Sequence, residues 1–334
     1  MRIGVSDTIG PADQIHEQAQ RAATLGYEAF WTQELVDTRD GLTTAAALGA
    51  WDLDIDLRVG LPSPYTRHPA LIATEVASVI DYAPPGRVTS LALGTSAPET
   101  LSKLGEPLDR PIRTLSETVD VLQPLLRDGY VDDRGEVFEA SNWRLRADAR
   151  ADLEFILAGM GPKMQELATA KYDGLWLPFN APVAFVEESV SAARDRLVDR
   201  FDRDPDAFVF ALNIPTAVVD EDVDEAVEDQ VRDVVEFTAW HCCSDHIKPL
   251  VERAGIDYDI EALRRAVRSH DYEAIRAVVD EAFLDAVAAV GRPEHVRDRY
   301  RAYVDAGIEY PVLYNYGARA VKRRNVEALA PAAF

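Results

Sequence analysis

The segment from residue 57 to residue 105 constrains the fold more than any other part of the sequence. Leu57–Gly60 is a short apolar run that ends in glycine, and Val88–Leu93 is a second apolar run, so both suit buried strands. Between them, Pro69 stands where a helix would begin, apolar residues follow at helical spacing, and Pro84 marks its end. Two strands separated by one helix over fewer than forty residues form a parallel βαβ unit. The sequence therefore predicts an α/β protein built on a parallel sheet.

The alternation of strand and helix continues along the whole chain. Eight segments are strand candidates: Ile3–Val5, Ala29–Trp31, Leu57–Gly60, Val88–Leu93, Leu153–Ala158, Gly174–Leu177, Phe208–Ile214 and Pro311–Tyr314. Helical patterns cover Ala12–Leu25, Gly41–Ala50, Pro69–Asp81, Arg110–Arg127, Pro162–Ala170, Ala184–Arg200, Asp220–Ala306 and Arg319–Ala330. Eight short strands that alternate with helices in 334 residues predict a (β/α)8 TIM barrel, with residues 1–334 as one domain. The alternative is an open, doubly wound sheet with an added helical lobe.

Two segments interrupt the alternation and are predicted to be insertions. Residues 129–146 are expected to form a small hairpin or loop before the fifth strand. Residues 220–290, between the seventh and eighth strands, are mostly helical and longer than one βα unit requires. Insertions of this kind usually cover the mouth of a barrel or form a subunit interface.

The charge balance restricts the partners and the environment of the chain. The net charge is −23, and only 5 of the 35 basic residues are lysine. An acidic, lysine-poor surface stays hydrated in concentrated salt, so we expect a halophilic source and no nucleic-acid partner. No apolar run is long enough to cross a membrane, and the first residues enter a strand without a signal peptide. With only the adjacent Cys242 and Cys243 as cysteines, these features predict a cytoplasmic protein.

Polar residues and glycines follow three neighbouring strand candidates, where parallel α/β barrels carry their active sites. They are Tyr65 and Arg67 after the third strand, Gly94, Thr95 and Ser96 after the fourth, and Gly159, Gly161, Pro162 and Lys163 after the fifth. Glycine lets a ligand approach the backbone, and a proline at a helix start leaves the next N–H groups free for an anion. A guanidinium pairs with a carboxylate or phosphate through two hydrogen bonds. The alternatives are an ordinary turn at Gly161 and an Arg67 that bonds loop carbonyls.

One segment contains residue types that bind metals, His241-Cys242-Cys243-Ser244-Asp245-His246. On a helix only pairs of these residues would share a face, and zinc needs further ligands that no other histidine supplies at a matching spacing. We therefore expect no metal site here, but a helix that lines the barrel mouth. Asn180 after the sixth strand and Tyr314-Asn315-Tyr316-Gly317 after the last are further candidates for the mouth.

Several motifs, in order along nearly the full length, resemble those of a known family. They are Tyr65-Thr66-Arg67-His68-Pro69-Ala70, Gly86-Arg87-Val88, Leu93-Gly94, Leu104-Gly105, Arg110-Pro111, Gly161-Pro162-Lys163-Met164, Asp173-Gly174, Gly291-Arg292-Pro293-Glu294 and Ala306-Gly307-Ile308. The chain resembles the luciferase-like barrel family, in its branch that depends on the deazaflavin coenzyme F420, the methylenetetrahydromethanopterin reductases. The resemblance implies hydride transfer between reduced F420 and a one-carbon unit on a tetrahydropterin or tetrahydrofolate.

The resemblance also implies where the cofactor lies. Its ring would stack near the third strand on a cis peptide at Gly60–Leu61, for which Pro62 and Pro64 offer alternative positions. Its anionic tail would lie near Gly161-Pro162-Lys163 and Thr95-Ser96. The reductases usually carry an acidic residue in the loop after the fourth strand, and Gly94-Thr95-Ser96-Ala97 lacks it.

The ends of the first two strands also differ from the reductases. Ser6-Asp7 stands at the position of an acidic residue, and Gln33-Glu34 at that of an Asp-His pair. Hydride transfer needs the donor ring and the acceptor carbon to be stacked closely, together with one acid that helps to open the substrate ring. Asp7 and Glu34 are the carboxylates at these strand ends, so they are the candidate acids. The alternative is that both are exposed loop carboxylates.

Three other functions remain open from the sequence. The same barrel hosts FMN-dependent monooxygenases, and the altered loops would also suit a reductase that takes hydride directly from NAD(P)H. A catalytically inactive homologue that binds a pterin or a partner protein is the third. Because such relatives are commonly oligomers, we expect a homodimer or homotetramer.

Overall fold

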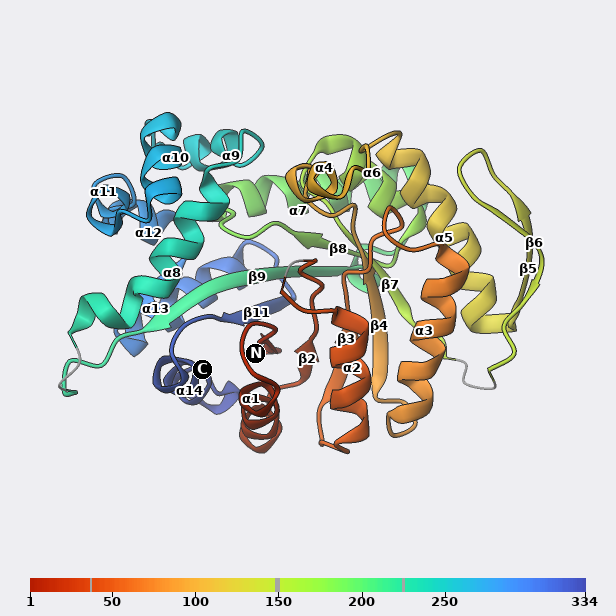
Figure 1. Cartoon of the computed structure of the whole chain (residues 1–334), viewed down its shortest axis with the longest axis horizontal. Helices are drawn as coiled ribbons and strands as arrows, with labels where there is room; N and C mark the ends of the chain where they lie inside the picture. The colour runs from red at the N-terminus through yellow and green to blue at the C-terminus, as the bar shows by residue number, and fades with distance from the viewer. Residues whose placement is uncertain (37, 148–150, 224–225) are drawn as a thin grey trace.

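Eight parallel strands close into a barrel in the computed structural model, which describes residues 1–36, 38–147, 151–223 and 226–334 (Figure 1). The strands are β1 (Gly4–Ser6), β2 (Ala29–Trp31), β3 (Asp56–Val59), β4 (Val88–Leu93), β7 (Glu154–Ala158), β8 (Gly174–Leu177), β9 (Val209–Val218) and β11 (Tyr310–Asn315). They pair in the order β1-β2-β3-β4-β7-β8-β9-β11, and β11 pairs again with β1, with Tyr314 beside Ser6. The predicted TIM barrel is therefore confirmed, and the open sheet is excluded.

Helices after the strands cover the outside of the barrel. They are α1 (Ala12–Leu25), α2 (Gly41–Ala50), α3 (Pro69–Tyr82), α5 (Pro111–Asp128), α6 (Pro162–Lys171), α7 (Val183–Phe201), α13 (Pro293–Asp305) and α14 (Arg319–Ala328). The start of α3 shows how the sequence sets these bounds. Pro69 occupies the first turn, and Nδ1 of the preceding His68 accepts a hydrogen bond from the N–H of Ala70 at 3.1 Å.

Two groups of elements lie in the segments for which insertions are predicted. Residues 129–146 contain a hairpin of β5 (Tyr130–Arg134) and β6 (Glu139–Arg144). Between β9 and β11 lie α8 (Val227–Cys242), α9 (Lys248–Arg253), α10 (Ile260–Ser269), α11 (Tyr272–Arg276), α12 (Glu281–Val287) and β10 (Ala289–Gly291). Figure 1 shows α9 to α12 grouped at one side of the barrel. Three short elements, α4 (Pro98–Leu104), η1 (Pro205–Ala207) and η2 (Pro331–Ala333), complete the fold.

Two tryptophans close the middle of the barrel. Trp31 and Trp176 meet edge to face, with ring centroids 4.7 Å apart, inside a cluster that also contains Ala92, Ile156 and Val312. Below them, Arg58 fills the other end, where its guanidinium lies over the ring of Tyr310 and pairs with Glu154 at 2.7 Å. The interior is thus a packed core, and in barrels of this kind active sites lie at the carboxyl ends of the strands.

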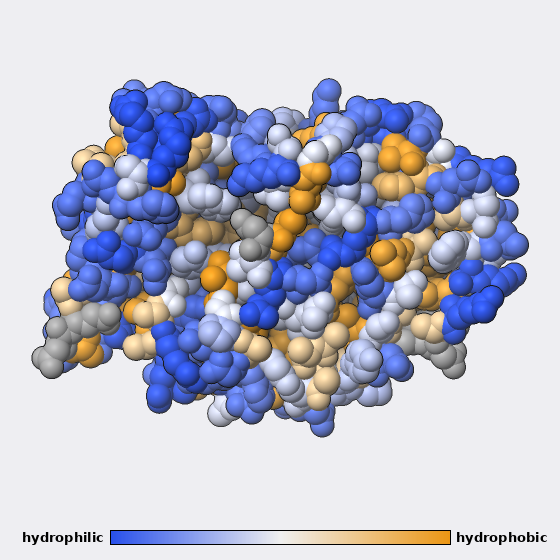
Figure 2. Space-filling view, viewed as in Figure 1, coloured by the Kyte–Doolittle hydropathy of each residue, from blue (hydrophilic) through white to orange (hydrophobic). Residues whose placement is uncertain are grey.

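The surface is mainly hydrophilic. Figure 2 shows hydrophilic residues over most of one face, with apolar residues scattered among them. Within the described ranges, every helix is too short or too polar to cross a membrane.

Candidate active site at the barrel mouth

The backbone after β3 forms one wall of the mouth. The peptide bond between Gly60 and Leu61 is cis, at the position that the resemblance implies rather than before Pro62 or Pro64. A Cβ on Gly60 would lie 3.1 Å from Cβ of Ala92 and 3.2 Å from the ring of Trp176, so this backbone rests on the barrel floor. The loop is therefore held from below by the interior packing.

The ends of β4 and β7 lie next to this wall, because β3, β4 and β7 are neighbours in the sheet. A Cβ on Gly94 would meet only Ala158, at 3.6 Å, and a Cβ on Gly161 would meet nothing within 4 Å. Gly161 precedes α6 without a side-chain cap, and the neighbouring Pro162 and Lys163 are exposed. The structure thus brings the predicted glycine-rich loops together and leaves open space above them.

Local contacts hold the remaining residues of these loops. The hydroxyl of Thr95 donates to the carbonyl of Ser96 at 2.9 Å, and the carbonyl of Thr95 accepts from the hydroxyl of Ser63 at 2.9 Å. Ser96 adopts a left-handed backbone conformation with φ of 68°. A Cβ on Gly159 would lie 2.6 Å from Cγ of Met164, so glycine is required there for packing.

Arg67 is surrounded by carboxylates. Its guanidinium donates to both carboxylate oxygens of Glu34, at 2.6 and 2.7 Å, and pairs with Asp40 and Glu75. Asp40 also caps α2 by accepting from the N–H of Thr43 at 2.6 Å. The expectation that Arg67 bonds loop carbonyls is wrong, since its partners are these acids. Arg67 joins the ends of β2 and β3 to the start of α2.

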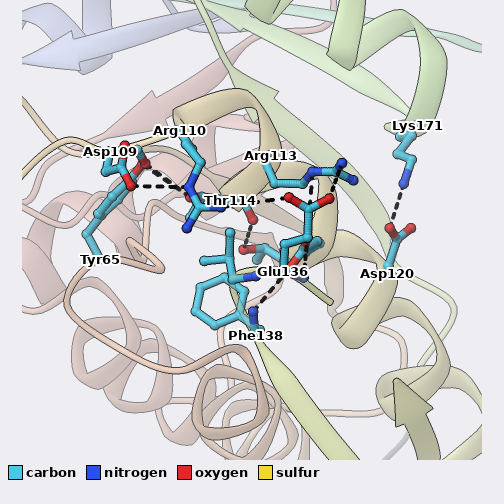
Figure 3. A network of polar contacts seen from close by, with 12 residues as sticks. Tyr65, Asp109, Arg110, Arg113, Thr114, Asp120, Glu136, Phe138 and Lys171 are labelled. Carbon is cyan, nitrogen blue, oxygen red and sulfur yellow. Dashed lines mark hydrogen bonds and ion pairs between the residues drawn. The ribbon is translucent and has the colours of Figure 1, made fainter. Parts of the chain in front are cut away.

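Tyr65 is tied to the hairpin side of the mouth. Its hydroxyl donates to the carbonyl of Asp109 and lies 3.3 Å from the hydroxyl of Thr114 (Figure 3). One turn further along α5, the buried Glu117 accepts hydrogen bonds from the N–H groups of Glu136, Val137 and Phe138 at 2.8 to 3.1 Å. Helix α5 therefore holds both the Tyr65 loop and the tip of the β5–β6 hairpin.

Asp7 and Lys322 form an ion pair at the end of β1. Nζ of Lys322 lies 2.7 Å from Oδ1 of Asp7, and the two side chains are 3% and 0% exposed. Burial raises the pKa of Asp7 to about 6 despite the opposing effect of Lys322. Oδ2 of Asp7 has no hydrogen-bond partner among the described residues. The same carboxyl therefore has one oxygen held by a cation and the other free for a ligand.

The expectation that Asp7 and Glu34 are exposed loop acids is wrong. Asp7 is buried, and the Glu34 side chain is only 5% exposed. Burial also raises the pKa of Glu34, although Arg67 opposes this effect. The prediction from sequence missed Lys322, which lies 315 residues from Asp7. The sequence feature that could have drawn attention to Lys322 is that lysine is rare in this chain, which has only five.

Other buried polar atoms at this end of the barrel lack partners within the described part of the chain. They are the hydroxyls of Ser6 and Tyr314, the amide of Asn213 and Oε1 of Gln33. Buried polar groups are normally hydrogen-bonded, so such a group of orphaned atoms is typical of a site completed by a ligand. These atoms and the glycine loops supply the hydrogen-bonding groups and the close backbone approach that a flavin or deazaflavin would require.

The segment with metal-ligating residue types does not converge on one point. Nδ1 of His241 lies 3.0 Å from Oδ1 of Asn180, whereas Asp245 pairs with Arg264 at 2.8 Å and Cys242 is a free, buried thiol. Among the described residues, no three or more His, Cys, Asp or Glu side chains lie close enough together to hold a metal ion. The segment begins in the last turn of α8, which packs on β9, and His241 faces Asn180 in the loop after β8.

Comparisons with known proteins agree with this arrangement. A sequence model of the family described as luciferase-like monooxygenase matches residues 2–310. The 5,10-methylenetetrahydromethanopterin reductase of Methanolobus tindarius is 25% identical over 301 residues, 89% of each chain. Among solved structures, the coenzyme F420 dependent tetrahydromethanopterin reductase from Methanopyrus kandleri has a TM-score of 0.83 at 21% identity, over 99% of this chain and 97% of that one. An F420-dependent secondary alcohol dehydrogenase in complex with an F420-acetone adduct has a TM-score of 0.75 at 19% identity, over 100% and 99%. The two structures share the fold of this chain.

Proposed function

The chain belongs to the luciferase-like monooxygenase family, and we propose that it is an F420-dependent oxidoreductase within that family. The proposed reaction is hydride transfer between reduced F420 and the methylene group of a methylene-tetrahydropterin or methylene-tetrahydrofolate. The similarity to proteins named methylenetetrahydromethanopterin reductase supports this substrate class. The single observation that carries the proposal is the buried Asp7, with one carboxylate oxygen on Lys322 and the other without a hydrogen-bond partner among the described residues.

The residues after β3, β4 and β7 would hold the cofactor. Gly60 and Leu61 would support the ring, and the loops Gly94-Thr95-Ser96 and Gly159 to Lys163 would face its side chain and anionic tail. The exposed start of α6 offers backbone N–H groups to an anion. When bound, the reduced deazaflavin supplies a hydride. Tyr65 and Arg67 would fix the surrounding loops, since their polar atoms bond to protein groups.

Asp7 is the better of the two candidate acids. Opening a methylene bridge between two nitrogens requires a proton on the leaving nitrogen. Both oxygens of Glu34 accept from Arg67, so Glu34 has no oxygen directed at a substrate and would orient Arg67. Within the described part of the chain, Oδ2 of Asp7 has no hydrogen-bond partner. The raised pKa of Asp7 keeps a proton on this carboxyl at a higher pH than an ordinary aspartate would.

Titration with F420 and with FMN in high salt, followed by fluorescence, tests the cofactor. We expect F420 to bind and FMN to bind much more weakly. The second step measures oxidation of reduced F420 with methylene-tetrahydrofolate and methylene-tetrahydromethanopterin. Binding of FMN alone would favour a monooxygenase. Binding of neither cofactor would favour a reductase that uses NAD(P)H or an inactive homologue.

A further inference from the structure

Helix α14 has two buried polar side chains, Lys322 and Asn325, one turn apart. The side chain of Asn325 accepts from the N–H of Val218 at 2.7 Å and donates to the carbonyl of Thr216 at 3.0 Å, and both partners belong to β9. Asn315, the last residue of β11, donates to the carbonyl of Lys322 at 3.1 Å. These hydrogen bonds fix α14 to β9 and β11 at the point from which the Lys322 side chain extends.

From this position, Lys322 reaches the loop that follows β1. Its Nζ lies 2.7 Å from Oδ1 of Asp7 and also donates to the carbonyl of Ile9. The loop packs around the ammonium, since a Cβ on Gly10 would lie 3.5 Å from Nζ, and Gly10 has a φ of 129°. The carbonyl of Gly10 accepts from Arg39 at 2.5 Å. Two cations thus hold this loop, and Lys322 is the one that contacts the carboxylate of Asp7.

The contact makes the two oxygens of the Asp7 carboxyl different. An ammonium group has donors and no acceptor, so Oδ1 accepts a hydrogen bond from Lys322 and is the poorer position for a proton. Oδ2 has no hydrogen-bond partner within the described part of the chain. When the carboxyl is protonated, its proton is therefore on Oδ2.

The charged and titratable groups around Asp7 come from three elements. Burial raises the pKa of Asp7, whereas Lys322 of α14, the backbone of Ile9 and Arg39 after β2 lower it, with Lys322 having the largest of these effects. Burial also raises the pKa of Tyr314 on β11, and the charge of Asp7 adds to this effect, so Tyr314 is neutral where Asp7 titrates. Without Lys322, the effect of burial on Asp7 would be opposed only by the weaker ones.

We propose that Lys322 is a positioning residue of the reaction, because its ammonium holds Oδ1 of Asp7, keeps the transferred proton on Oδ2 and fixes the loop after β1. This inference rests on the proposed function, in which Asp7 supplies a proton. Lys322 acts through Asp7 and not on the substrate. Its removal should therefore affect the reaction only while residue 7 has a carboxyl group.

Lys322→Met replaces the ammonium by an apolar group of similar length, and 13C NMR can follow the Asp7 carboxyl, identified by its loss in Asp7→Asn. A nearby opposite charge lowers the pKa of a carboxyl by about 1 to 3, so the titration midpoint should move upward by about that amount in Lys322→Met. The pH above which kcat of the reductive reaction falls should move with it. The maximal kcat should fall about tenfold or more, because the proton donor is no longer held in place.

A measurement on the wild type keeps the test valid if Lys322→Met does not fold. The chain has five lysines, so a protein labelled with 15N only at lysine gives a simple spectrum. The 15N signal of the Lys322 ammonium should change at the pH where Asp7 titrates. A signal that stays constant through this pH would overturn the proposal.

Two variants serve as controls. Arg323→Met removes an exposed cation at the next position of α14, where Arg323 pairs with Glu327, and it should keep the wild-type midpoint of Asp7. Lys322→Arg keeps a cation at the position and should bring the midpoint back toward that of the wild type. In the Asp7→Asn background, Lys322→Met should lower kcat no further.

The outcomes separate this inference from the proposed function. An unchanged midpoint and pH profile in Lys322→Met, or an equal loss of kcat with and without the Asp7 carboxyl, would overturn the role of Lys322 and leave the proposed function standing. If Lys322→Met moves the midpoint but the wild type oxidises reduced F420 with neither substrate, the proposed function is wrong and the control of the Asp7 proton by Lys322 stands.

Discussion

Two opposing effects set the pKa of Asp7. This pKa predicts how the rate of the proposed reaction depends on pH. Burial raises the pKa of its carboxyl to about 6, and Lys322 lowers it by a smaller amount. An acid must carry its proton, so the reductive reaction should be fastest below about pH 6 and slow about tenfold for each further pH unit. Measurement of kcat from pH 5 to 8 checks this.

Asp7→Asn should lower kcat by about 100-fold or more and abolish the pH dependence, while the Kd of F420 stays unchanged. Glu34→Gln is the matched control. It should weaken the contact with Arg67 but keep the pH profile of the wild type. A wild-type rate for Asp7→Asn would contradict the assignment.

The residues of the candidate site differ in how far the sequence could identify them. Asp7 could be selected because it follows the first strand, and Gly60 and Leu61 because of the family resemblance. Lys322 could not, because its role depends on closure of the barrel, which brings α14 beside β1. The role of Arg67 could not be predicted either. A sequence shows a guanidinium at the mouth but not that Glu34, Asp40 and Glu75 surround it.

The first turn of α2 packs so closely on the β3 loop that a single methyl group should disturb it. A Cβ on Gly41 would lie 2.4 Å from the carbonyl oxygen of Gly60, and backbone cannot move as a flexible side chain can. We expect Gly41→Ala to reduce the free energy of unfolding by about 2 kcal/mol and to weaken F420 binding, because the loop must shift. Denaturant unfolding and fluorescence titration measure the two effects.

Gly161→Ala is the control for stability, since its Cβ would meet nothing within 4 Å. It should unfold at the same denaturant concentration as the wild type. Equal stability of Gly41→Ala and Gly161→Ala would show that the contact between α2 and the β3 loop is unimportant.

The β5–β6 hairpin depends on one carboxylate of α5. Glu117 accepts three backbone N–H groups at the hairpin tip, and a Cβ on Gly135 would lie 2.1 Å from its Oε2. These hydrogen bonds lower the pKa of Glu117 even though burial opposes them. We expect Glu117→Gln to reduce the free energy of unfolding by roughly 2–4 kcal/mol at pH 7.

The pH dependence of stability tests the direction of the effect of Glu117. A lowered pKa means that the unfolded state binds the proton first, so the stabilisation is present above the ordinary value of 4.5 and is lost as the pH falls below it. The difference between wild type and Glu117→Gln should therefore shrink between pH 5 and pH 3. Arg113→Gln is the control, because the half-exposed Arg113 lies 3.7 Å from Glu117 and should contribute less than about 1 kcal/mol. A constant difference would contradict the prediction.

The sequence predicts the bounds of a helix or strand best where a single local pattern defines the element. The bounds of Ala29–Trp31, Val88–Leu93 and Gly174–Leu177 were predicted as the structure has them, because apolar runs between turns are local signals. Helix α4 was missed since it has only seven residues, too few to establish a period. Strand β10 was missed because it is defined by pairing with the end of β9, a contact between distant segments.

The mouth of the barrel has two sides that differ in the residues they carry. The β3, β4 and β7 ends carry glycines and an exposed helix start, which suit an anionic cofactor, whereas β8, β11 and α8 carry aromatic rings. Asp7 directly follows Ser6, the residue of β1 that pairs with Tyr314 of β11. Helix α8 belongs to the insertion at residues 220–290, so this insertion contributes Phe237, Trp240 and His241 to the mouth. An inserted helix can therefore vary in sequence while the loops after β3, β4 and β7 stay the same.

The charge of the whole molecule predicts how its stability depends on salt. The chain has 58 acidic and 35 basic residues, so repulsion between carboxylates destabilises the folded state in dilute buffer. Salt also weakens surface ion pairs such as Arg2–Glu28 and Arg319–Glu17, but each is worth less than about 1 kcal/mol. The Debye length falls from about 10 Å at 0.1 M to about 3 Å at 1 M salt, which removes long-range repulsion first. We therefore expect the Tm to rise by roughly 10 °C between about 0.1 and 2 M KCl. Sucrose at matched osmolality is the control, because it favours burial without screening charge. Equal melting in dilute and molar KCl, or an equal rise in sucrose, would show that the net charge does not limit the stability of this protein.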